Sequence, residues 1–283
     1  MPVTLLGAAE IRALAAELDV TPTKKLGQNF VVDANSVRKI VHVAKVQPHE
    51  RVVEVGPGLG SLTLAILETG ARVTAVEIDH RLAEKLPSTA ASHGVEPGAL
   101  TVVDADALRI TELDGRPTVL VANLPYNVSV PVLLHFLEHF DFIERGVVMV
   151  QSEVGERLAA PPGSKVYGSP SVKAAWYGCW RLAGTVSRQV FWPVPNVDSV
   201  LVAFDRDSDP RGSEAERRRT FEIVDAAFGQ RRKMLRQALS SVLGGSAAAA
   251  SAILESAGVA PTARGEQLSI EDFVRIARVA PVA

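Results

Sequence analysis

The strongest constraint on the fold is an alternation of short apolar runs with longer amphipathic runs between about residue 50 and residue 204. Each apolar run has the length of a buried strand, and the intervening runs, such as SLTLAILETG (61–70), have helical periodicity. This alternation is typical of an α/β fold with a parallel, doubly wound sheet. The apolar runs are RVVEV (51–55), RVTAVEI (72–78), LTVV (100–103), TVLVAN (118–123), GVVMVQ (146–151) and DSVLVAF (198–204), the last expected at a sheet edge.

The composition changes after residue 204. The segment DRDSDPRGSEAERRR (205–219) is polar and charged, as in a linker or at a helix start. The rest is mostly helical in pattern, and Ser269 is a plausible N-cap for the final helix. We predict two domains: residues 1–204, with 1–48 as an N-terminal helical and loop extension, and a small helical domain at 205–283.

Charge and cysteine content narrow the protein class. The net charge of −2 does not mark a nucleic-acid binder as a whole, so such a role needs a local patch. The single Cys179 excludes an internal disulfide and fits a reducing compartment. No apolar run approaches the roughly 20 residues that span a bilayer, and the N-terminus lacks the basic region of a secretory signal. We expect a cytoplasmic protein with no membrane role.

A histidine pair, His135 and His139, has the four-residue spacing that can hold a metal on a helix. The intervening residues do not make H-E-x-x-H, and no third ligand is evident. A helix-surface pair is favoured, and we expect no metal.

A glycine-rich turn, VVEVGPGLGSLT (52–63), joins the first apolar run to the helix that follows. Gly56, Gly58 and Gly60 let the backbone turn sharply and let a ligand approach the main chain. The spacing is G-x-G-x-G, whereas a dinucleotide site uses G-x-G-x-x-G. This difference argues against an NAD-dependent oxidoreductase.

Acidic residues follow three of the expected strands. Glu77 closes the second, where a carboxylate can accept the ribose hydroxyls, and Asp106 follows the third, where it can accept from an adenine amino group. Together with Glu54 and Asp104 they would repel a pyrophosphate and suit a cationic ligand such as S-adenosylmethionine. The alternative is that these acids are solvated loop residues.

The segment VANLPYNVSVP (121–131) ends an apolar strand in an amide, an imide and an aromatic ring. Adenine N6 is a poor nucleophile because its lone pair is delocalised into the ring. The Asn123 oxygen and a carbonyl of the Leu124–Pro125 turn can accept its two N–H groups and turn the lone pair toward a methyl donor. Tyr126 can stack on the base. The bland alternative is a strand-ending turn with a core tyrosine.

Ordered sequence blocks resemble those of the small-subunit ribosomal RNA adenine N6,N6-dimethyltransferase family. The blocks are KKLGQNFVVD (24–33), VVEVGPGLGSLT, VEID (76–79), DADAL (104–108), NLPYNVSVPVL (123–133), VYGSPSV (166–172), FWPVPNVDSV (191–200), FGQRRKMLRQAL (228–239) and LSIEDF (268–273). The resemblance implies a class I, Rossmann-like methyltransferase domain with a helical C-terminal domain, using S-adenosylmethionine. The implied substrate is a pair of adjacent adenosines near the 3′ end of 16S rRNA, dimethylated on a small-subunit precursor.

The resemblance also implies roles for individual residues. The implied cofactor contacts are Asn29, Val31, Gly56, Gly58, Glu77, Asp106 and Asn123. The implied adenine pocket consists of Asn123, Leu124, Pro125, Tyr126 and Phe191. The chain departs from the family pattern at Val31, where Leu is usual, and at Val194 and Asn196, where Pro and Lys are usual. The change at Asn196 removes a possible phosphate contact.

Basic residues that could bind RNA gather in the C-terminal half. The cluster consists of Arg217, Arg218, Arg219, Arg231, Arg232, Lys233 and Arg236, and on helices it could present a basic face to phosphates. The alternative is a solvated face paired with Glu214, Glu216, Glu222 and Asp225. Lys24 and Lys25 are further candidates near the cofactor loop. We expect a monomer.

Two other functions remain open from the sequence. One is the related antibiotic-resistance methylase of large-subunit (23S) rRNA, which shares the N-terminal motifs. The other is a non-catalytic RNA-binding assembly factor on the same fold. The C-terminal blocks favour the small-subunit enzyme, and the presence of Glu77, Asn123, Pro125 and Tyr126 favours catalysis.

Overall fold

The computed structural model describes residues 2–20 and 29–281, which form two compact units. The first unit comprises residues 1–155 and 181–206, and the second comprises 156–180 and 207–283. Residues 156–180 therefore pack with the C-terminal helices, although the sequence-based division assigns them to the N-terminal domain. The division at 204/205 as a functional boundary stays a prediction.

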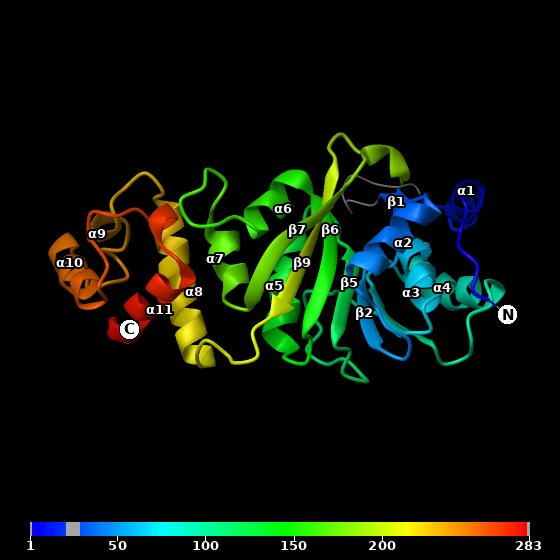
Figure 1. Ribbon diagram of the computed structural model, residues 1–283, viewed down its shortest axis with the longest axis horizontal. Helices are drawn as coiled ribbons and strands as arrows, with labels where there is room; N and C mark the ends of the chain where they lie inside the picture. The colour runs from blue at the N-terminus through cyan, green and yellow to red at the C-terminus, as the bar shows by residue number, and fades with distance from the viewer. Residues whose placement is uncertain (1, 21–28, 282–283) are drawn as a thin grey trace. The chain divides into compact units, whose positions relative to one another are not determined.

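The first unit is built on a seven-stranded sheet of order β4-β3-β2-β5-β6-β9-β7 (Figure 1). Its strands are β2 (Arg51–Val55), β3 (Arg72–Glu77), β4 (Leu100–Asp104), β5 (Val119–Asn123), β6 (Arg145–Gln151), β7 (Gly178–Val186) and β9 (Ser199–Arg206). The five strands β2 to β6 run parallel to their neighbours, and β9 pairs with β6 in the antiparallel sense. The α/β fold class and all six predicted strands are confirmed.

The predicted edge position of the 198–204 strand is wrong. β9 lies between β6 and β7, and its residues from Ser199 to Phe204 are all buried. The edge position belongs to β7, whose residues are mostly exposed or half-buried. Because β7 has no continuous apolar run, the sequence pattern did not reveal it.

Helices cover both faces of this sheet. The helices of this unit are α1 (Ala8–Glu17), α2 (Ala34–Val43), α3 (Ser61–Leu67), α4 (His80–Ser92), α5 (Ser129–His139) and α6 (Ser152–Leu158), and α1 shares its buried core with α3 and α4. Apolar residues of α2 and α3, such as Ile40 and Ile66, share one core with Val121 and Met149 of the sheet. On the opposite face α6 packs so closely that a Cβ on Gly155 would overlap side chains of β9.

A second, two-stranded antiparallel sheet joins distant parts of the chain. It pairs β1 (Phe30–Val31) with β8 (Phe191–Trp192), which follows the 3₁₀ turn η1 (Arg188–Val190). The register places Phe30 opposite Trp192, and their rings are stacked with centroids 6.3 Å apart. This small sheet fixes the segment beginning at Asn29 beside the main sheet.

The second unit is helical. Its elements are α7 (Ser169–Ala175), α8 (Glu214–Gly229), α9 (Leu235–Ala238), α10 (Ala247–Ser256), the 3₁₀ turn η2 (Gly265–Gln267) and α11 (Ile270–Val279). The predicted N-cap is confirmed, since the Ser269 side chain accepts from the Asp272 N–H. The polar 205–219 segment holds the start of α8, which Ser213 caps. Within the part of the chain that the structure describes, no helix combines the length and apolar character needed to cross a membrane.

Candidate active site

A cavity with a volume of about 260 Å³ opens at the carboxyl ends of the parallel strands. The loops after β2, β3, β4 and β5 line it, together with Asn29–Val31. In the sheet β2 has β3 on one side and β5 on the other, so the chain order reverses there. Such a switch point is where open α/β sheets bind ligands.

The glycine turn after β2 forms the floor of this cavity. Gly58 has φ +58°, and a Cβ there would lie 3.0 Å from the Phe30 ring. Gly56 has φ +70° and lies against the loop after β5, with Pro125 and the Asn123 carbonyl within 4 Å of a Cβ position. The left-handed backbone favours glycine at both positions, and at Gly58 the Phe30 ring also leaves little room for a Cβ. The predicted role of the turn as a close-approach surface fits this geometry.

Glu77 is almost fully buried at the end of β3 and holds the glycine turn. Its Oε2 accepts from the Gly58 N–H, and its Oε1 accepts from the N–H groups of Ile78 and Asp79, each at 3.0 Å. Burial raises the pKa of Glu77, and these three backbone donors oppose the shift. A carboxylate has about four lone-pair sites, so Oε2 retains room for one further donor.

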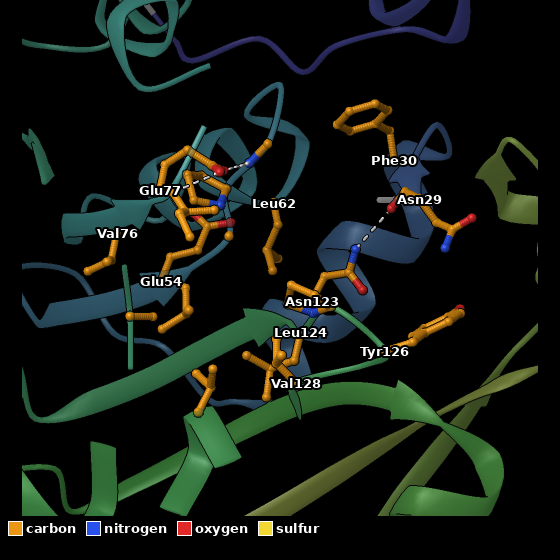
Figure 2. A pocket seen from close by; sticks show the side chains of 18 of the residues that line it. Asn29, Phe30, Glu54, Leu62, Val76, Glu77, Asn123, Leu124, Tyr126 and Val128 are labelled. Atoms are coloured by element: carbon orange, nitrogen blue, oxygen red, sulfur yellow. Dashed lines mark hydrogen bonds between the residues drawn. The ribbon is translucent and has the colours of Figure 1, made fainter. Parts of the chain in front are cut away.

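Glu54 is a second buried acid beside the same cavity. Figure 2 shows Glu54 and Glu77 on one side of the cavity, with Asn123 and Tyr126 on the other. Burial raises the pKa of Glu54 to about 8; the Thr63 hydroxyl opposes this shift and the charge of Glu77 adds to it. The Oε2 of Glu54 has no hydrogen-bond partner among the described residues.

The charged residues that line the cavity indicate which kind of ligand it can hold. No lysine, arginine or histidine is among the described residues that line the cavity, and two buried carboxylates are. A buried acid is costly to ionise unless a positive or donor group meets it, so Glu54 holds its proton near neutral pH until such a group lies against its orphaned oxygen. The acidic lining of the cavity therefore fits a cationic methyl donor such as S-adenosylmethionine and disfavours a pyrophosphate.

Asn123 ends β5 at the opposite wall. Its Nδ2 donates to the main-chain carbonyl of Asn29 at 3.2 Å. Because a carbonyl only accepts, this contact fixes which side of the amide carries the nitrogen. The Oδ1 atom is thereby left as the acceptor that faces away from Asn29.

The Leu124–Tyr126 turn follows directly. Leu124 is buried and donates its N–H to the Met149 carbonyl at 3.1 Å, so the turn is tied to β6. The Pro125 carbonyl accepts from the Val128 N–H at 3.3 Å. Tyr126 lines the cavity, and its hydroxyl lies 2.9 Å from the Ser199 Oγ. The three residues therefore lie together at one wall of the cavity.

The remaining predicted site residues do not all line the cavity. Asn29, Val31 and Asp106 all line the cavity, and the Asp106 carboxylate accepts from the Leu108 N–H at 2.9 Å. Phe191 lies elsewhere, because its ring is buried in the core shared by the sheet, α2 and α3, with 2% exposed. The structure does not bring Phe191 to the cavity that holds Asn123 and Tyr126.

Sequence reasoning missed apolar side chains at the cavity. Ile78 and Leu108 line it, and both remain exposed. Each follows a strand-end acid within two residues, Glu77 and Asp106, and that adjacency is the signal that would have revealed them. Phe30 was also missed, although its neighbours Asn29 and Val31 were predicted.

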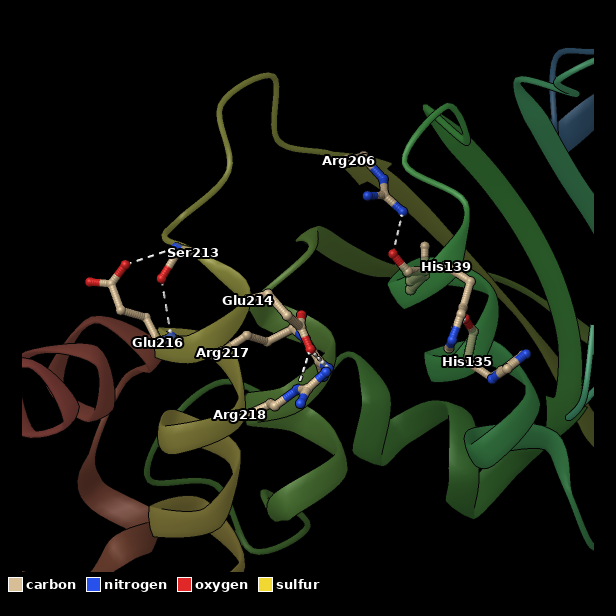
Figure 3. Close-up of polar contacts among 9 residues, drawn as sticks. His135, His139, Arg206, Ser213, Glu214, Glu216, Arg217 and Arg218 are labelled. Carbon is tan, nitrogen blue, oxygen red and sulfur yellow. Dashed lines mark hydrogen bonds and ion pairs between the residues drawn. The ribbon is translucent and has the colours of Figure 1, made fainter. Parts of the chain in front are cut away.

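The predicted basic cluster does not form one helical face. Arg217 and Arg218 both bind Glu214, whose pKa they lower to about 2, as Figure 3 shows for the contacts. Arg219 pairs with Glu222. On α8 all three arginines are therefore paired with acids, as the alternative has it, but only Arg218 is solvated, because Arg217 is buried and the Arg219 side chain is 15% exposed.

The rest of the cluster lies beyond α8, which ends at Gly229. Arg231 pairs with Glu266, whereas Arg232, Lys233 and Arg236 make no ion pair with another described residue. Arg232 and Lys233 are exposed in the turn before α9. Lys24 and Lys25 lie outside the described residues.

Each histidine of the pair uses a ring nitrogen to hydrogen-bond a main-chain carbonyl. The Nε2 of His135 donates to the Ile110 carbonyl at 2.7 Å, and the Nδ1 of His139 donates to the His135 carbonyl at 3.0 Å (Figure 3 shows both residues). Residues 2–20 and 29–281 contain no group of three or more His, Cys, Asp and Glu side chains placed to hold a metal ion.

Comparison with known proteins agrees with this cavity. The model of the ribosomal RNA adenine dimethylase family matches residues 21–280. A protein of Leifsonia xyli subsp. xyli named ribosomal RNA small subunit methyltransferase A is 68% identical over 274 residues, which cover 96% of this chain and 98% of that protein. A protein of the same name from Streptomyces coelicolor is 59% identical and covers 98% and 97%.

Two solved structures share the fold. A dimethyladenosine transferase from Plasmodium falciparum superposes with a TM-score of 0.74 at 23% identity, over 86% of this chain and 94% of that one. The 23S rRNA methyltransferase ErmE superposes with a TM-score of 0.66 at 26% identity, over 89% and 99%. Identity to the small-subunit methyltransferases is thus more than twice that to the large-subunit one. The chain belongs to the ribosomal RNA adenine dimethylase family.

Proposed function

We propose that this chain dimethylates N6 of two adjacent adenosines near the 3′ end of 16S rRNA, acting as a monomer on a small-subunit precursor in the cytoplasm. As a family member it is an rRNA adenine dimethyltransferase, and S-adenosylmethionine is its methyl donor. The observation that carries the site assignment is the Oδ1 of Asn123, which accepts no hydrogen bond from a described residue, at the cavity wall opposite two buried acids.

The acidic side of the cavity would hold the donor. S-adenosylmethionine supplies an electrophilic methyl group on a cationic sulfur. The Oε2 of Glu77 has one lone-pair site left for a ribose hydroxyl, and Asp106 can accept from the adenine amino group. Ile78 and Leu108 offer apolar surface to the flat ring, and Asn29, Val31, Gly56 and Gly58 complete the wall.

The β5 turn would hold the substrate base. We assign the Asn123 Oδ1 as one acceptor for the N6 hydrogens. Because the Pro125 carbonyl already accepts from Val128, the Leu124 carbonyl is our candidate for the second. Two acceptors would draw N6 toward tetrahedral geometry, so that its lone pair could form the new N–C bond. The S–C bond of the donor would break in the same step, its electron pair would stay on sulfur as a neutral thioether, and the surplus proton on N6 would pass to water. Positioning supplies most of the rate enhancement, and no general base is needed.

Stacking and phosphate contacts complete the assignment. Tyr126 would stack on the base, which is worth about 1–3 kcal/mol in single-stranded complexes. Phe191 reaches this pocket only if its ring leaves the core, so we assign it a packing role between β8 and the core of the first unit. For the RNA backbone we assign Arg232, Lys233 and Arg236, with Arg231 held by Glu266 at 2.9 Å. Lys24 and Lys25 stay candidates.

The test is methyl transfer from labelled S-adenosylmethionine to small subunits isolated from cells that lack this methylation. We expect two dimethylated adenosines, located by primer extension on 16S and 23S rRNA in parallel. Asn123→Ala should abolish transfer while subunit binding survives, and Asn35→Ala, an exposed asparagine on α2, should behave like the unchanged protein. Label in 23S rRNA alone, or undiminished transfer by Asn123→Ala, would contradict the proposal.

A further inference from the structure

We propose that Ser199 is a positioning residue which holds the Tyr126 ring in the orientation that stacks on the target adenine. The inference rests on the function proposed above. Its basis is the contact of 2.9 Å between the Tyr126 hydroxyl and the Ser199 Oγ, which joins two segments 73 residues apart in the sequence. Neither composition nor spacing singles out Ser199.

Ser199 is a rigid anchor. It is fully buried as the first residue of β9 and pairs with Gln151 of β6. The preceding residue, Asp198, is fixed on two sides. Its carboxylate accepts from the Arg188 N–H at 2.9 Å, and its carbonyl accepts from the Ser152 N–H and hydroxyl at 3.1 and 2.9 Å. The Ser199 hydroxyl therefore has little freedom to follow a moving partner.

Tyr126 needs such an anchor because it lies in the turn between β5 and α5. Its ring is only partly buried, and one face must stay open for a base to stack there. In Figure 2 the hydroxyl lies at the end of the ring farther from Asn123. The backbone holds one end of the side chain and Ser199 holds the other, so ring rotation is restricted without any contact on the stacking face.

The phenol keeps its proton under ordinary conditions. Burial raises the pKa of Tyr126, the charge of Asp198 adds to the shift, and the bond with Ser199 opposes it. A neutral phenol and a serine hydroxyl can each donate to the other, so this bond survives small shifts of the turn. The Tyr126–Ser199 pair can therefore hold the ring in place while the pocket beside it accepts first an unmethylated and then a methylated adenine amine.

Loss of the contact between Ser199 and Tyr126 should lower kcat without weakening donor binding. A ring that is free to rotate still offers apolar surface, so the donor should bind as before. The base would reach the reactive geometry less often, and kcat would fall. A misplacement of about 1 Å can cost up to about 100-fold in rate. For the loss of one hydrogen bond we expect a decrease of about 3- to 30-fold.

The experiment compares Ser199→Ala, Tyr126→Phe and the double variant in methyl transfer to undermethylated small subunits. Each single variant should lower kcat with donor affinity unchanged within about twofold, and the double variant should be no slower than Tyr126→Phe alone. Ser152→Ala is the matched control, since it removes a hydroxyl beside Asp198 that does not touch Tyr126 and leaves the main-chain bond from the Ser152 N–H to the Asp198 carbonyl in place. Ser199→Thr, which keeps the hydroxyl, should recover most of the activity.

A spectroscopic readout separates positioning from activity. The chain has three tyrosines, so 3-fluorotyrosine labelling gives three ¹⁹F signals, and Tyr126→Phe identifies that of Tyr126. Ser199→Ala should shift this signal, and Ser152→Ala should not.

Three results would overturn the inference while leaving the proposed function intact. They are normal kcat in Ser199→Ala, multiplicative effects in the double variant, and equal losses in Ser152→Ala. Absence of adenine methylation by the unsubstituted protein would instead overturn the proposed function, and this inference with it.

Discussion

The side chain of Asn123 is hydrogen-bonded to the backbone of Asn29, with 3.2 Å between the amide nitrogen and the carbonyl oxygen. One residue thus connects a segment that lines the cavity proposed for the methyl donor with the turn assigned to the substrate base. The same contact orients the acceptor atom on which the proposed chemistry depends. Substitutions at Asn123 should therefore affect catalysis more than they affect folding.

Asn123→Asp is the sharpest test of this contact. The carboxylate keeps an acceptor of the same shape but cannot donate to Asn29, and its charge is repelled by that carbonyl. We expect kcat for methyl transfer to fall by about 100-fold or more, comparable to the loss of one preorganised group in other active sites. Asn35→Asp on the exposed face of α2 serves as the control. Activity within threefold of the unchanged protein would refute the assignment.

Gly58→Ala should destabilise the protein and weaken donor binding. The position has φ +58°, and the new methyl would meet Phe30 at 3.0 Å. A left-handed non-glycine residue costs about 1–3 kcal/mol. Gly98→Ala isolates the backbone effect, since φ is +82° there and no atom lies within 4 Å of the Cβ. Urea unfolding should show a larger loss for Gly58→Ala, and calorimetry should show weaker S-adenosylmethionine binding for that variant only; equal losses would contradict this prediction.

Glu54 should make the stability of the donor-free protein depend on pH. Its pKa rises from 4.5 to about 8 on folding, mainly through burial. Between these values the folded state holds a proton that the unfolded state has lost, so the free energy of unfolding falls as pH rises. Glu54→Gln removes this dependence and should stabilise the protein at pH 8 by roughly a few kcal/mol.

Denaturant titrations between pH 5 and pH 8.5 measure the effect of Glu54. Glu112→Gln, at an exposed position, should leave the pH dependence of the unfolding free energy unchanged. Some slope will persist in Glu54→Gln, because burial also raises the pKa of Glu77. An unchanged slope in Glu54→Gln would show that Glu54 is already ionised in the fold.

Arg232 and Lys233 should contribute to subunit affinity through phosphate contacts. Replacing each with Ala should weaken binding and reduce the salt slope of log K by about 1, because one fewer counterion is released. Arg218→Ala is the comparison, since that side chain is exposed but paired with Glu214 at 2.6 Å. Filter binding from 50 to 300 mM salt gives the slopes. Parallel slopes for all three variants would argue against a contact.

The sequence predicted the central sheet because buried parallel strands are continuous apolar runs. The predicted run 51–55 coincides with β2, and 118–123 differs from β5 by one residue. It did not predict β7 or the β1–β8 pair. β7 is too polar to stand out, and a two-residue strand has no period to detect.

The site was predictable where it follows strand ends and unpredictable where it depends on long-range packing. Glu77, Asp106 and Asn123 end or follow strands, so the topology alone brings them together. The burial of Phe191 and the bond between Tyr126 and Ser199 are set by how β8 and β9 return to the sheet. No local sequence pattern predicts how β8 and β9 return to the sheet, and the family resemblance did not predict it either.

The pairing of β1 with β8 bears on the order in which this chain matures. All described residues that line the cavity precede Leu133 in the sequence, yet the strand that carries Phe30 and Val31 has its partner at Phe191 and Trp192. A nascent chain that has emerged only as far as α5 would possess every lining side chain without the support that seats Asn29 above the glycine turn. Competence to take up the methyl donor should then arrive late in synthesis, close to completion of the sheet.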